Sequence, residues 1–158
     1  VLVLLIRIPF PAAPFLKYDP ADIPIFITTF AFGPIAGFVV TVVVSFLQAF
    51  ILGDDSIYGF IMHVLATGAF VLIAGSIYRK QKTKTGAIVA LTAGTITMTI
   101  VMVIANYFVT PFYMGVPTTA VVEMLLPIII PFNLLKAGIN SVLTFLLYKR
   151  ISKFLHKQ

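Results

Sequence analysis

The sequence contains no cysteine and little charge of either sign. Without cysteine, disulfides and thiolate metal sites are excluded. Only five of the 158 residues are acidic and 10% are charged, whereas 60% are hydrophobic and the mean hydropathy is +1.10. No soluble domain of this size has such a composition. It predicts an all-α fold, a polytopic membrane helix bundle that forms one transmembrane domain over residues 1–158.

Motifs of common enzymes are also missing from the sequence. There is no GxxxxGK[ST] loop, so the chain does not itself hydrolyse ATP through that loop, and there is no HExxH, GxSxG or pair of catalytic carboxylates. The acidic residues all fall outside the apolar segments, which argues against a proton or sodium relay built on an intramembrane carboxylate. We therefore expect no enzyme, no metal, no cofactor and no nucleic-acid partner.

The basic residues gather in two clusters, at 79–84 and 149–157. By the positive-inside rule, both clusters are cytoplasmic. The apolar segments between them then predict three crossings, inward over 56–78, outward over 86–108 and inward again over 125–148. The acidic pair at 54–55 is accordingly outside.

Residues 23–52 form a stretch that is too long for one membrane crossing and short for two full ones. Gly33-Pro34 interrupts them, so we expect a short helix over 23–32 and a full one over 35–52. Residues 1–8 are apolar except for Arg7 but too few to span a bilayer. We interpret them as the outer end of a truncated first helix, or else as a short interfacial segment. The first interpretation gives six transmembrane helices with both termini cytoplasmic.

Small residues recur at helix-packing spacing in two rows, Gly86, Ala90 and Gly94, and Gly33 with Gly37. Such rows let helices approach closely in lipid, and the partner is either a helix of the same bundle or another subunit. We favour packing within the bundle.

The segment around Asp19 has a structural and a functional interpretation. Asp19 can cap a helix, with Pro20 in its first position and Asp22 supporting the cap. Residues 9–18 ahead of it form a proline-stiffened loop rich in apolar side chains, including Leu16 and Tyr18. A solvent-exposed tether does not need them, whereas a lid over an apolar ligand does.

Lys136 is the only charge within residues 125–148. A cation there costs about 3 kcal/mol on insertion scales, so it should face a protein interior or a polar ligand. Asn133 and Asn140 share its helical face, and Asn106 lies near the outer end of the preceding span. If the regular helix starts at Pro131, then Lys136 lies in its first two turns. The alternative is that the asparagines bond neighbouring helices and the lysine snorkels.

His63, in the outer third of its span, is expected to be a satisfied core histidine rather than a ligand contact. Two amides and one ammonium suit a small, mostly neutral heteroaromatic ligand taken from outside. The inner segments 88–91 and 142–147 are nearly apolar, which favours a closed pocket over a channel or facilitator. A purely structural subunit would leave Lys136 unexplained.

Four motifs resemble a known family. DPADIP at 19–24 and FAFGPIAG at 30–37 resemble S components, the substrate-binding subunits of energy-coupling factor (ECF) vitamin transporters. ANYFVTPFYMG at 105–115 and PFNLLKAGIN at 131–140 resemble the riboflavin-specific type.

The resemblance implies six helices in a bacterial plasma membrane and a high-affinity riboflavin site near the extracellular face. By motif matching, Asn106, Asn133 and Lys136 contact the flavin ring, and Leu16 and Tyr18 enclose it from the lid. The implied partners are a transmembrane coupling subunit and two cytoplasmic ATPases. The family's AxxxA docking motif would lie before residue 1. An S component for another small heteroaromatic vitamin is the alternative, and a stand-alone facilitator is a second one.

Overall fold

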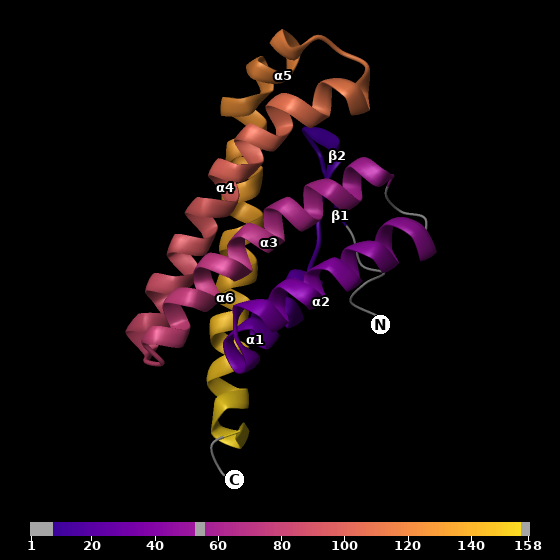
Figure 1. Cartoon of the computed structure of the whole chain (residues 1–158). Coiled ribbons are helices and arrows are strands. Elements are labelled where there is room, and N and C mark those ends of the chain that lie inside the picture. Colours follow the sequence, from indigo (N-terminus) through magenta and orange to yellow (C-terminus); the bar gives the residue numbers. More distant parts are fainter. Residues whose placement is uncertain (1–7, 53–55, 156–158) are drawn as a thin grey trace.

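The computed structural model describes residues 8–52 and 56–155, with side chains up to Tyr148. A two-stranded hairpin precedes a bundle of helices (Figure 1). The elements are β1 (Ile8–Phe10), β2 (Ala13–Tyr18), α1 (Asp22–Phe32), α2 (Pro34–Phe46), the π-helical η2 (Leu47–Ile51), α3 (Ile57–Lys80), α4 (Lys84–Met114), α5 (Thr118–Met124), the π-helical η3 (Leu125–Ile129) and α6 (Ile130–Leu155).

The helix lengths make the chain a multi-pass membrane protein. Four segments are long and apolar enough to cross a bilayer, at Pro34–Ile51, Ile57–Lys80, Lys84–Met114 and Thr118–Tyr148. Helix α1 has 11 residues and is about 16 Å long, short of the roughly 30 Å of a hydrocarbon core. The predicted spans are therefore found, with α4 longer than expected at both ends. The connection between α3 and α4 lies at the same end of the bundle as the end of α6 (Figure 1).

The predicted first helix falls mostly outside the described residues. Only Ile8 is described, and it lies in β1 rather than in a helix. Among residues 8–52 and 56–155, the apolar helices are α1 and the four long segments, so the expected count of six is not reached there.

Gly33 separates α1 from α2, as the Gly-Pro pair predicts. Its φ of 98° lies in the region that favours glycine, and its N–H bonds to the carbonyl of Thr29 at the end of α1. The small-residue rows serve packing within the bundle. A Cβ at Gly37 would collide with the side chain of Thr29, and one at Gly94 would lie 3.0 Å from the ring of Phe70.

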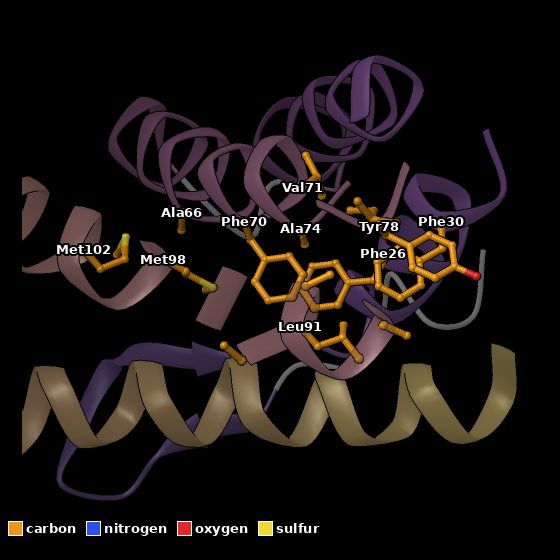
Figure 2. Close-up of a cluster of buried hydrophobic side chains, with 14 of the residues drawn as sticks. Phe26, Phe30, Ala66, Phe70, Val71, Ala74, Tyr78, Leu91, Met98 and Met102 are labelled. Atoms are coloured by element: carbon orange, nitrogen blue, oxygen red, sulfur yellow. The ribbon is translucent and has the colours of Figure 1, made fainter. Parts of the chain in front are cut away.

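Aromatic rings fill the core between α1, α3, α4 and α6. Phe26 stacks on Phe70 with ring centroids 3.8 Å apart, and Phe30 stacks on Tyr78 at 4.3 Å. Figure 2 shows these rings in a row, with Met98 and Met102 continuing the row at one end. This apolar cluster holds the four helices together below the hairpin.

The loop predicted over residues 9–18 is a β-hairpin. β1 and β2 pair antiparallel with Ile8 opposite Tyr18, and a register shift after Pro9 accommodates the prolines. Its buried Leu16 joins a second apolar cluster with Phe132 of α6, and the ring of Phe10 lies 5.3 Å from that of Phe132. The hairpin is thus fixed to the start of α6.

The regular α-helix of the last span begins at Ile130, one residue before Pro131. Helical structure runs from Thr118 through α5 and η3 into α6, and Pro127 is accommodated in the π-helical segment. Within α6, Lys136 lies in the first two turns, as predicted, although α5 and η3 precede this helix. Lys136 lies deep in the bundle and is 8% exposed.

Candidate ligand-binding cavity under the hairpin

A cavity of about 240 Å³ lies between the hairpin and helices α3, α4 and α6. Its volume is somewhat below the range of about 300–1,000 Å³ that is typical of small-molecule sites. Apolar side chains dominate the wall, with a few polar groups among them. The lining residues are Pro14, Phe15, Leu16, Lys17, Asp19, Ser56, Tyr58, Gly59, Met62, His63, Ala66, Met98, Met102, Asn106, Val109, Thr110, Tyr113, Phe132, Asn133 and Lys136.

Four of the five residues proposed from the sequence meet at this cavity. Leu16 contributes from β2, Asn106 from α4, and Asn133 with Lys136 from α6. All four are buried, at 1% exposure for each asparagine. Tyr18 is not among the lining residues, because its hydroxyl is directed toward α6 at Asn140.

Both asparagines bond to their own helices rather than across the bundle. The Nδ2 of Asn106 donates to the carbonyl of Met102 at 2.7 Å, and its Oδ1 accepts from the hydroxyl of Thr110 at 2.8 Å. The Nδ2 of Asn133 donates to the carbonyl of Ile129 at 2.8 Å. Within the described residues these amides are therefore not links between helices, and the bonds fix their orientation at the cavity wall.

Lys136 forms a buried ion pair. Its Nζ lies 3.2 Å from Oδ2 of Asp22, and the two side chains are 9% and 1% exposed. A lysine that snorkels would place its ammonium in water or among headgroups. Here the ammonium stays inside the bundle, next to a carboxylate and at the edge of the cavity.

The prediction that every acidic residue lies outside the apolar segments is wrong for Asp22. It is the first residue of α1 and is fully buried. Its Oδ1 accepts from Nε2 of His63 and the hydroxyl of Thr67, both at 2.9 Å. Its Oδ2 faces the ammonium of Lys136 and accepts from Nδ2 of Asn140 at 3.3 Å. An ionised acid therefore lies inside the bundle, contrary to the expectation that none would.

The predicted helix cap is only partly present. Oδ1 of Asp19 accepts from the backbone N–H of Ala21 at 2.8 Å, which stabilises the turn ahead of α1. The N-cap residue is Ala21, without a side-chain cap bond, and Asp22 points into the bundle instead of back to the cap. The acid in the first turn serves tertiary contacts rather than the local helix end.

His63 is a satisfied core histidine, as predicted. Its Nδ1 lies 2.9 Å from the hydroxyl of Ser45, and its Nε2 faces Asp22. Because it also lines the cavity, it connects the wall to the buried carboxylate.

The base of the hairpin is anchored to two helices. The hydroxyl of Tyr18 donates to Oδ1 of Asn140 at 2.7 Å, and the Nδ2 of Asn140 donates to the carbonyl of Asp19 at 3.0 Å. Gln48 in η2 donates to Oδ2 of Asp19 at 2.7 Å. Burial, followed by the nearby carboxylates of Asp22 and Asp19, raises the pKa of the Tyr18 phenol, so it remains a donor.

Comparisons with known proteins agree with this geometry. Residues 1–148 match the family model described as the substrate-specific component of ECF transporters. The chain belongs to this family. The family consists of transporter components, so this S component is a transport protein and not an enzyme.

Individual relatives match over almost the whole length. A riboflavin transporter, RibU, of Staphylococcus aureus is 36% identical over 96% of this chain and 84% of its own. The riboflavin transporter FmnP of Bacillus subtilis is 29% identical over 99% of this chain and 88% of its own. A solved S component of a bacterial ECF transporter superposes with a TM-score of 0.83 at 36% identity, covering 99% of this chain and 90% of that one.

Proposed function

We propose that this S component captures riboflavin from the extracellular side for an ATP-driven ECF importer. The observation that carries the proposal is the cavity in which two amides and one ammonium meet beneath the hairpin. The relatives in Staphylococcus aureus and Bacillus subtilis, both named as riboflavin transporters, support the choice of ligand.

The chemistry of the wall suits a flavin ring. One edge of the ring system carries carbonyl and N–H groups in a plane, which amides and an ammonium can bond. We assign Asn106, Asn133 and Lys136 to that edge. Met98 and Met102 offer polarisable surface to the ring faces, and Leu16 closes the cavity from the hairpin. Tyr18 encloses the ligand indirectly, because it fastens the hairpin to Asn140.

Energy for release is proposed to come from partners. The sequence has no P-loop, so a transmembrane coupling subunit and two cytoplasmic ATPases of the ECF module would supply it. The basic connection at 79–84 supports an orientation with both termini in the cytoplasm of a bacterial cell. Residues 1–158 would then act as one substrate-binding domain.

Flavin binding to the purified protein tests the proposal. We expect a preparation with flavin absorbance bands and tight quenching of riboflavin fluorescence on titration. Binding of a different heteroaromatic vitamin, with no response to riboflavin, would support the alternative S component. Riboflavin uptake into vesicles that contain this chain alone, without ATPases, would instead support a facilitator.

A further inference from the structure

The two members of the ion pair differ in their position relative to the cavity. Lys136 lines the cavity, whereas Asp22 is not among the lining residues and lies behind the ammonium, at 3.2 Å. Asp22 also belongs to the short α1, which follows the hairpin directly. Any influence of this carboxylate on a ligand must therefore pass through another side chain.

The carboxylate itself is held firmly. Besides the ammonium, its two oxygens accept from His63 and Thr67 on α3 and from Asn140 on α6. Three donors from two helices fix its place independently of Lys136. A carboxylate so held presents a fixed negative charge to the flexible ammonium of Lys136.

The ammonium needs such a partner to stay at the wall. A buried ammonium without a counter-charge is strongly disfavoured, and a lysine stem is long enough to carry its head elsewhere. An ammonium has three donors, so the bond to Asp22 leaves others for a ligand. The carboxylate thus sets the position of a charged group that faces the cavity.

We propose that Asp22 is a positioning residue for ligand binding, acting chiefly through Lys136, which it holds at the cavity wall. This inference rests on the proposed function, because riboflavin is the probe. The residues that orient Asp22, foremost Thr67, should share its role to a lesser degree.

A double-mutant cycle tests the inference with riboflavin titrations of the full chain in detergent. Asp22→Asn should weaken binding by about 10- to 100-fold, the range seen when an outer partner of a metal ligand is removed. In a Lys136→Met background, the same change should have a much smaller effect, limited to what passes through His63, which lines the cavity and bonds to Asp22. The absorption bands of the bound flavin should shift equally in both single variants, since each removes the same ammonium from the ring edge.

Thr67→Val keeps the inference testable if Asp22→Asn does not fold. It removes one donor to Oδ1 at nearly constant volume and should weaken binding by about threefold, an effect that Lys136→Met should largely abolish. Thr41→Val is the matched control, because this buried hydroxyl bonds only to its own helix. Its affinity should equal that of the wild type.

Two results would overturn the positioning role while leaving the proposed function intact. One is wild-type affinity in both Asp22→Asn and Thr67→Val. The other is an equal loss with and without Lys136, which would mean that Asp22 acts through His63 or on the fold. Failure of the wild-type protein to bind riboflavin would instead contradict the proposed function, and this inference with it.

Discussion

The half of the bundle beneath the hairpin and the half farther from it fill their interiors in different ways. Beneath the hairpin there is an open cavity with amide, ammonium and imidazole groups at its wall. Farther along, stacked rings of Phe26, Phe70, Phe30 and Tyr78 leave a solid apolar core. A pore requires polar groups through the full depth. The contrast favours a pocket that is closed below, in which a ligand can be held but through which it cannot pass without a rearrangement.

Hydrogen bonding differs between the two regions as well. Around the helix break, hydroxyls such as those of Thr29 and Thr41 donate to carbonyls of their own helices. Near the cavity, Asp22, His63 and Lys136 bond across three helices. Polar groups that bond within one helix contribute little to the arrangement of the helices. The group of Asp22, His63 and Lys136 links three helices and therefore fixes the position of the cavity wall.

The largest expected effect comes from opening the solid half. Phe70→Ala removes a ring that stacks on Phe26 and fills the space beside Gly94. We expect a loss of about 3–5 kcal/mol in the free energy of unfolding, because the neighbours cannot fill the void. Chemical unfolding in detergent measures this change.

Phe108→Ala is the control for that experiment. Phe108 is also a phenylalanine, but it lies on an exposed side of α4, at 63% exposure. Its truncation therefore leaves no internal void. An equal loss in both variants would show that the row of rings is no better packed than the lipid-facing surface.

The next effect concerns the cavity. Lys136→Met should lower the free energy of riboflavin binding by about 3 kcal/mol, the loss of a hydrogen bond to a charged group. Folding should persist, because Asp22 keeps its bonds to His63 and Thr67. Fluorescence titration and thermal unfolding measure both quantities. Lys84→Met, at an exposed position, should bind riboflavin normally. Unchanged affinity in Lys136→Met would show that the ammonium is not part of the binding site.

Much of the fold could be predicted from the sequence because it depends on local signals. The apolar segments give the spans, and Gly33-Pro34 gives the break between α1 and α2. A lone cation in an apolar helix marks Lys136 as a group that needs a partner. Helical periodicity placed Asn133 on the face of Lys136, and both line the cavity.

The partner of Lys136 could not be predicted in the same way. Asp22 is distant in sequence, and next to Asp19-Pro20 its local pattern fits a helix cap equally well. Only the packing of α1 against α3 and α6 decides that the carboxylate points inward. The hairpin was missed because its prolines and its register shift hide the alternation that marks a strand.

The asparagines offer a finer test of the polar wall. Asn106→Leu and Asn133→Leu should each weaken riboflavin binding by about 1–3 kcal/mol, because a polar edge of the ligand would lose its partner. Both amides bond to their own helices, so their loss should change the free energy of unfolding little. The reference variant is Thr110→Val, which removes the hydroxyl bonded to Asn106 and should be about as stable. Normal binding by both leucine variants would make these residues structural.

The smallest expected effect is at the anchor of the hairpin. Tyr18→Phe removes the bond to Asn140 and should cost about 1 kcal/mol, seen as dissociation of riboflavin roughly five times faster. Because burial raises the pKa of this phenol, the stabilising protonated form persists below pH 10 and is lost only as the pH rises through the raised value. The wild-type rate should therefore not depend on this group between pH 6 and 9. Tyr107→Phe, at a 43% exposed position on α4, is the control. Equal dissociation rates in the Tyr18 variant and the wild type would show that the apolar contacts and the bonds to Asp19 hold the hairpin without the Tyr18 hydroxyl.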